Sequence, residues 1–221
     1  DFWKRTTLLA IVASMIARRQ FGISPDAAYT YALFHDAGIP MMMRRFPKYG
    51  EIVDNARREG KLLADAENEF FPCSHPIIGS LVIRNWGLPS ILGQAIRFHH
   101  EQDAYDLPDT TLPGGALSLI AVTQVAEHLM NDILQEQDLE VGDHLFEKAL
   151  AYLGISAHDL EDLQHRVDLG IAVHLAVQCL DRSPDAACIE QFTRDGIRLR
   201  DLRRRFTGVL LHAHHEGRAH A

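Results

Sequence analysis

The chain has 221 residues, 47% of them hydrophobic, which suits one large globular domain with or without an appendage. No apolar run approaches the roughly 20 residues that cross a bilayer, and no secretory signal is visible, so we expect a cytoplasmic protein that does not span a membrane. The net charge of −8 argues against a general nucleic-acid binder.

Apolar residues recur at three- and four-residue steps along nearly the whole chain, a period that predicts helices. The first helix ends at Gly22. The second begins at residues 24–26, where Ser can cap the helix and Pro fits its first turn. It carries the adjacent pair His35 and Asp36 at its C-terminal end and stops around residues 38–40. Further helices are expected over residues 49–58, 62–71, 77–86 (after a capped start at Ser74), 90–100, 116–134, 146–153, 159–180 and 185–214.

The predicted fold class is all-α, because we find no alternation typical of strands and no internal repeat. We expect a helical core over residues 1–154 and a C-terminal helical extension over residues 155–221, which packs on that core or continues it. Arginines crowd residues 194–205, as in a solvated helix face or an anion-binding surface.

Five side chains that can bind metal ions are spread along the chain: the adjacent pair His35 and Asp36, the lone His75, and the pair His99 and His100. Imidazole and carboxylate are the groups that hold first-row transition metals. The spacing therefore predicts a site where several helices meet.

Several motifs of the chain resemble one protein family. The segment 33–38, LFHDAG, is similar to the LLHDIG signature of HD-domain proteins. The later segments match the branch called HDOD, for HD-related output domain. These segments are Glu67-x-Glu69, HPIIG at 75–79, WGLP at 86–89 and AIRFHH at 95–100, and the opening FWKRT at 2–6 is similar to the helix start of the family. The resemblance covers roughly residues 2–130.

The resemblance implies an HD-domain-like helical bundle, here with additional C-terminal helices. HDOD domains usually carry a further helical half before this point, which this sequence lacks, so we expect the chain to begin inside a longer protein. In bacteria they often sit beside receiver or cyclic-diguanylate-turnover domains and are described as regulatory modules.

The resemblance also implies which ligands are present. In catalytic HD proteins a first His, the His-Asp pair and a final Asp hold one metal, and the motif Asp bridges to a second metal held by three more His. The first His falls here at Arg5 and the final Asp at Gln124, so the first position keeps only His35 and Asp36. The second position keeps all its candidates, which are Asp36, His75, His99 and His100.

Two interpretations of this site remain open. In one, a single transition metal ion (Fe, Zn, Mn or Ni) binds at the second position. In the other no metal binds, and an inward-facing Arg5 replaces the cation by forming an ion pair with Asp36.

Our leading hypothesis is a non-catalytic regulatory module of a bacterial signalling protein, which acts through contacts with a protein partner or a neighbouring regulatory domain. The alternative is an enzyme, a metal-dependent phosphohydrolase acting on a nucleotide or a cyclic dinucleotide. Nucleic-acid binding through residues 194–205 ranks below both. Among other residues, we expect Trp3 and Trp86 to anchor the core and residues 41–43 (MMM) to pack in it, with a partner-binding surface as the alternative for the methionines. Glu67 and Glu69 could support a ligand from a position near His75, but carboxylates on a helix surface are the commoner case.

Overall fold

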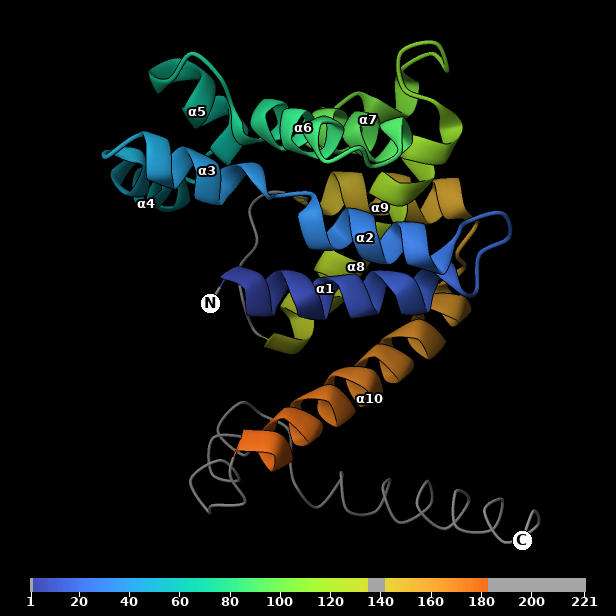
Figure 1. Cartoon of the computed structure of the whole chain (residues 1–221). Coiled ribbons are helices and arrows are strands. Elements are labelled where there is room, and N and C mark those ends of the chain that lie inside the picture. Colours follow the sequence, from blue (N-terminus) through green and yellow to red (C-terminus); the bar gives the residue numbers. More distant parts are fainter. Residues whose placement is uncertain (1, 135–141, 183–221) are drawn as a thin grey trace, which may run out of the picture. The chain divides into compact units, whose positions relative to one another are not determined.

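The computed structural model of the chain describes residues 2–134 and 142–182, and all regular structure in these ranges is helical (Figure 1). The helices are α1 (Phe2–Ala17), α2 (Pro25–Phe34), α3 (Gly38–Arg45), α4 (Tyr49–Glu59), α5 (Leu63–Phe70), α6 (His75–Asn85), α7 (Ser90–Phe98), the 3-10 helix η1 (Ala104–Asp106), α8 (Gly114–Leu134), α9 (Gly142–Leu153) and α10 (Ala157–Arg182). The all-α prediction is confirmed. None of the described helices combines the length and the apolar character that crossing a membrane requires.

The start of α2 follows from its sequence. Ser24 is the N-cap, its side chain accepts a hydrogen bond from the backbone N–H of Ala27, and Pro25 lies in the first turn. Ser74 holds the corresponding position before α6, but its side chain makes no capping hydrogen bond, so only the position of that predicted cap is right.

Helix α3 differs from the prediction, which ends the second helix around residues 38–40 and has no helix over residues 41–48. Pro40 instead lies in the first turn of α3, where a helix does not need its missing N–H. Of the three methionines that follow, only Met42 is buried, whereas Met41 and Met43 are exposed. The prediction that all three pack in the core is therefore wrong for two of them.

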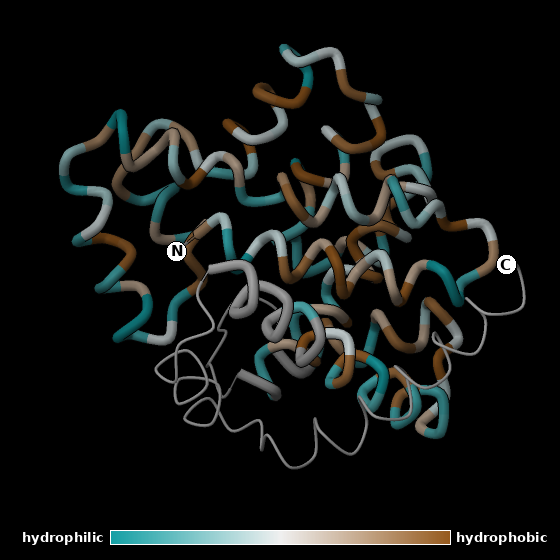
Figure 2. Tube along the Cα trace, turned by 60° about the horizontal axis from the view of Figure 1, so that its bottom comes forward, coloured by the Kyte–Doolittle hydropathy of each residue, from teal (hydrophilic) through white to brown (hydrophobic). Residues whose placement is uncertain are grey.

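The main core lies between α1, α2 and α8. Helix α1 packs against both of the others, and α8 also packs against α7 and α9. Leu9, Val12 and Ile16 of α1 are almost completely buried. Figure 2 shows hydrophobic and hydrophilic residues alternating along most helices, as expected when one side of a helix is buried. Trp3 and Trp86, predicted as core anchors, are about half exposed, so that prediction is wrong.

Helices α3, α4 and α5 (residues 38–70), here called the α3–α5 lobe, have a small apolar cluster of their own. Ala56, Leu63 and Ala66 are buried in it, and partly buried side chains of Ile39, Ile52 and Val53 pack against them. The three helices are grouped together in Figure 1. The lobe contacts the rest of the fold largely through α3 against α6 and α5 against α6.

The chain divides into two compact units, residues 1–167 and 168–221, and of the second unit the structure describes only residues 168–182. The predicted division into a core over 1–154 and an extension over 155–221 stays a prediction. The predicted helix 185–214 and the arginine-rich residues 194–205 lie outside the described residues.

Candidate metal centre

The candidate ligands lie at the ends of three helices. His35 and Asp36 directly follow α2, His75 is the first residue of α6, and His99 and His100 directly follow α7. Helix ends can bring side chains from distant parts of the sequence to one point without bending a helix. The spacing of the motifs in the sequence therefore corresponds to one site in space.

Two glycines, Gly38 and Gly79, allow α6 to lie close to the α2–α3 junction and to α7. A Cβ atom on Gly38 would lie 2.0 Å from the backbone carbonyl oxygen of His75, and one on Gly79 would lie 3.0 Å from Cγ2 of Ile96. The α2–α3 junction is thus in backbone contact with the start of α6. Gly79 likewise permits close packing of α6 against α7.

Four of the predicted ligands form a compact group. Donor atoms of Asp36, His75, His99 and His100 all lie within 4.8 Å of one another. Oδ1 of Asp36 is 3.3 Å from Nε2 of His99 and 3.5 Å from Nε2 of His75, and Nε2 of His75 is 2.9 Å from Nε2 of His100. A tetrahedron whose ligands lie about 2.0–2.2 Å from its centre has edges of about 3.3–3.6 Å. The two distances from Asp36 match this edge, and shifts of the other ligand atoms within their 4.8 Å spread would let the group hold one transition metal ion.

Hydrogen bonds outside this group fix which ring nitrogen carries the proton. Nδ1 of His35 lies 2.7 Å from the carbonyl oxygen of Ala32, and Nδ1 of His99 lies 2.7 Å from that of Ile96. A carbonyl oxygen can only accept, so both Nδ1 atoms donate and both Nε2 atoms are left for the interior of the site. Metal-binding histidines usually show this arrangement.

The Nε2 atoms inside the site therefore lie close to other atoms that accept hydrogen bonds. Nε2 of His99 faces the carboxylate of Asp36, and Nε2 of His75 faces Nε2 of His100. Two acceptors at such distances repel each other unless a cation, either a proton or a metal ion, lies between them. The nitrogen and carboxylate oxygen atoms of this group are suitable ligands for a metal ion.

The charge states fit the same conclusion. Burial alone would raise the pKa of Asp36, but the charge of His35 and hydrogen bonds from His35 and His75 outweigh it and hold that pKa well below its usual range. Burial lowers the pKa of His99, and burial with the charges of His99 and His75 lowers the pKa of His100 well below its usual value. Both rings are therefore neutral near pH 7, as a metal ligand requires.

His75 behaves differently because it has two acidic neighbours. Burial opposes its protonation, but hydrogen bonds and charges from Asp36 and Glu67 outweigh this and raise the pKa of His75 to about 10. A metal ion at the site would have to displace a proton from this ring.

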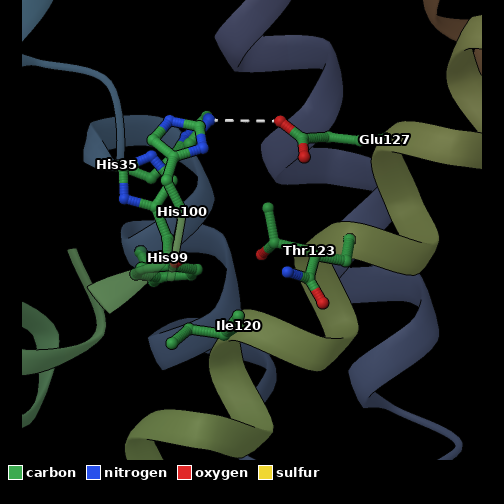
Figure 3. A pocket seen from close by; sticks show the side chains of 8 residues that line it. His35, His99, His100, Ile120, Thr123 and Glu127 are labelled. Atoms are coloured by element: carbon green, nitrogen blue, oxygen red, sulfur yellow. Dashed lines mark ion pairs between the residues drawn. The ribbon is translucent and has the colours of Figure 1, made fainter. Parts of the chain in front are cut away.

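Sequence reasoning missed one acidic group, Glu127 of α8. Its Oε1 atom lies 3.2 Å from Nε2 of His35, which is also 3.2 Å from Oδ2 of Asp36, and Figure 3 marks the first of these contacts with a dashed line. Burial would lower the pKa of His35, but the two carboxylates raise it well above its usual value. Glu127 follows Gln124 by three residues on the same helix side, and that spacing was the available signal.

The two positions where the family has ligands hold side chains with other partners. Gln124 is buried and accepts a hydrogen bond from the hydroxyl of Tyr105 at 2.6 Å. Nη2 of Arg5 donates to Oδ1 of Asn131 at 2.9 Å. Within the described ranges the ion pairs of Asp36 are all with histidines, so the predicted Arg5–Asp36 pair is wrong.

A narrow pocket opens on one side of the ligand group. The residues lining it are Tyr31, His35, His99, His100, Ile120, Thr123, Gln124 and Glu127. Its volume leaves room for about one water molecule. Thr123 stands across the pocket from the histidines (Figure 3), and its Oγ1 atom is buried without a hydrogen-bond partner in the part of the chain that the structure describes.

Comparison with known proteins agrees with this fold. Residues 1–102 match the family model of the HDOD domain. A protein from Shewanella amazonensis SB2B, provisionally described as a phosphohydrolase, is similar with a TM-score of 0.57 at 21% identity, covering 76% of this chain and 58% of that one. An HDOD domain protein of unknown function from Geobacter sulfurreducens gives 0.57 at 20% identity, covering 77% and 58%.

A third similar structure is the response regulator MmoQ from Methylococcus capsulatus strain Bath, with a TM-score of 0.57 at 20% identity, covering 74% of this chain and 60% of that one. The chain thus spans less than two thirds of the length of each of these proteins. At these identities the likeness shows a shared fold alone. No curated protein matches the chain.

Proposed function

Residues 1–102 belong to the HDOD domain family, and from this premise we propose that the chain is a regulatory output module with one transition metal ion as an internal cross-link. The module acts through contacts with a protein partner or a neighbouring regulatory domain. We place it in the cytoplasm of a bacterium, as part of a signal-transduction protein.

One observation carries the proposal: the Nε2 atoms of His75 and His99 and the carboxylate of Asp36 converge from three helices, and hydrogen bonds behind the rings hold the Nε2 atoms in that direction. A metal ion held there, with His100, would join the ends of α2, α6 and α7. Because the unfolded chain has no such preformed site, the binding free energy of the metal would stabilise the fold.

The same geometry supports a structural rather than a hydrolytic role. Arg5 and Gln124 stand where the first metal position has its other two ligands, and both have other partners, so that position keeps only His35 and Asp36 of its ligand set. The adjoining pocket leaves room for about one water molecule, far less than a nucleotide needs. The fold is also that of a protein described as a response regulator, which is compatible with signalling.

A second candidate, a metal-dependent phosphohydrolase acting on a nucleotide or cyclic dinucleotide, is favoured by one contact. His35 and Glu127 form a hydrogen-bonded pair next to the ligand group and face the pocket. A metal ion held by Asp36, His75, His99 and His100 would act as a Lewis acid toward a phosphoryl oxygen, and the His35–Glu127 pair would be the nearest group able to take or give a proton.

A single set of assays separates the two candidates. Protein loaded with Mn²⁺, Fe²⁺, Zn²⁺ or Ni²⁺ is incubated with bis(p-nitrophenyl) phosphate and with cyclic diguanylate, beside matched samples of Glu127→Gln and His99→Ala. The regulatory proposal expects a metal-dependent rise in melting temperature and no turnover above that of the free metal. Turnover in the wild type that is lost in both variants would contradict it and support the hydrolase.

A further inference from the structure

A buried carboxylate lies behind the ligand group and belongs to none of the ligands. Glu67 of α5 is completely buried beside His75, so of the two predicted arrangements the less common one holds for Glu67, and the helix-surface one is wrong for it. A carboxylate without partners would be costly there. Its Oε2 atom accepts from the backbone N–H of His75 at 2.7 Å and lies 2.7 Å from Nδ1 of the same residue, and its Oε1 atom accepts from the hydroxyl of Tyr49.

The contact with Nδ1 determines how His75 can bind a metal. Oε2 of Glu67 already accepts from the backbone N–H of His75, so the Nδ1 atom beside it donates to the same oxygen. Nε2 of His75 is then the ring nitrogen that faces Asp36 and His100, where a metal ion would displace its proton. The backbone hydrogen bond of the same residue holds the start of α6 against Glu67. Glu67 thus fixes the direction of this ring and the proton on its Nδ1 atom.

Glu67 and Tyr49 come from the α3–α5 lobe, which has its own apolar cluster. Tyr49 is the first residue of α4 and is completely buried. The hydrogen-bonded series from Tyr49 through Glu67 to His75 is therefore a polar connection between this lobe and the candidate metal centre.

We propose that Glu67 is a positioning residue of the metal centre, and that through Glu67 metal binding and the order of the α3–α5 lobe depend on each other. The inference rests on the metal site of the proposed function. It adds a route by which occupancy of a buried site reaches a lobe that carries exposed Met41, Met43 and Phe70.

The test compares Glu67→Ala with Glu69→Ala. Glu69 lies on the same helix, but it is exposed and pairs with Lys61 at the surface. Zn²⁺ affinity is measured by competition with a chelator. Loss of a group that orients a metal-binding histidine costs about 10–100-fold in affinity, so we expect that loss in Glu67→Ala and an unchanged value in Glu69→Ala. Glu67→Gln, which keeps an acceptor but loses the charge, should fall between them.

Two further readouts separate positioning from general loss of structure. Hydrogen exchange should show that Zn²⁺ slows exchange over residues 49–70 in the wild type and in Glu69→Ala but not in Glu67→Ala. The Nδ1–H proton of His75 should give a downfield NMR signal in the wild type that is absent in Glu67→Ala. If Glu67→Ala does not fold, Tyr49→Phe serves instead, with a smaller loss of affinity and a shifted signal.

Unchanged Zn²⁺ affinity and an unchanged His75 signal in a folded Glu67→Ala protein would overturn this inference and leave the proposed function intact. A wild type that binds no metal would instead overturn the proposed function and the coupling together. In that case the His75 signal, which needs no metal, would still decide whether Glu67 positions the ring.

Discussion

Replacing Gly38 with alanine should push the α2–α3 junction, which carries Asp36, away from the start of α6, which carries His75. A Cβ atom at this position would lie 2.0 Å from the backbone oxygen of His75 and less than 3 Å from its backbone carbonyl carbon and Cα. All three atoms are backbone, so no side-chain rotation relieves the overlap, and the α2–α3 junction must move from α6 by more than an ångström. Overpacking a core costs about 1–3 kcal/mol, and we expect Gly38→Ala at the upper end, about 3 kcal/mol.

Urea unfolding followed by circular dichroism measures this cost. Gly50→Ala is the matched control, because no atom lies within 4 Å of a Cβ at that position in α4. Alanine replaces glycine in a helix there, so the control should be unchanged or more stable by up to about 1 kcal/mol. Since the displacement also moves Asp36 from His75, the variant should bind metal more weakly. A Gly38→Ala protein within about 0.5 kcal/mol of the wild type would refute the close approach of these helices.

Two more predictions concern protonation and the pocket. The pKa of His75 is raised to about 10, so in metal-free protein its contribution to stability is complete below the unfolded value near 6.5 and is lost as the pH rises through 10. A metal must displace this proton, so its affinity, measured by titration calorimetry in several buffers, should increase about tenfold per pH unit over that window, and a flat profile would contradict the assignment. Thr123→Val removes a buried hydroxyl that has no partner within the described residues, and metal-free protein should gain about 1 kcal/mol in urea unfolding; a comparable loss would mean that the hydroxyl is satisfied.

The ligand group could be predicted because each motif lies beside a helix boundary that the sequence marks. Gly38, Ser74 and Pro89 indicate where helices begin or end, and the boundaries of α2, α6 and α7 follow closely. A ligand at a helix end can be located from the helix boundary alone, whereas a ligand within a helix also requires the rotation of that helix to be known.

The remaining groups depend on how helices are rotated against one another. Glu67 lies in a short helix rich in polar residues, where an exposed carboxylate is the common case, and its burial follows from the packing of α5 against α6. Glu127 faces His35 because α8 presents that side to α2. Arg5 points toward Asn131 of α8 rather than toward Asp36 for the same reason. A single sequence does not encode these rotations in any local pattern.

The misplaced aromatic and apolar residues have a related cause. The size and apolar character of Trp86 favour a core position, yet its ring packs edge-on against Phe34 with ring centroids 5.5 Å apart and remains about half exposed. Core positions in α1 are filled by smaller residues such as Val12 and Ala13, which allow α2 and α8 to approach.

The central claim is that Asp36, His75, His99 and His100 hold one metal ion. Elemental analysis of protein purified without chelator or a metal-affinity tag, repeated on His99→Ala, tests it most directly. We predict about one transition metal ion per chain in the wild type and none in the variant. A wild type without metal, even after anaerobic loading with Fe²⁺, Mn²⁺, Zn²⁺ and Ni²⁺, would contradict the claim.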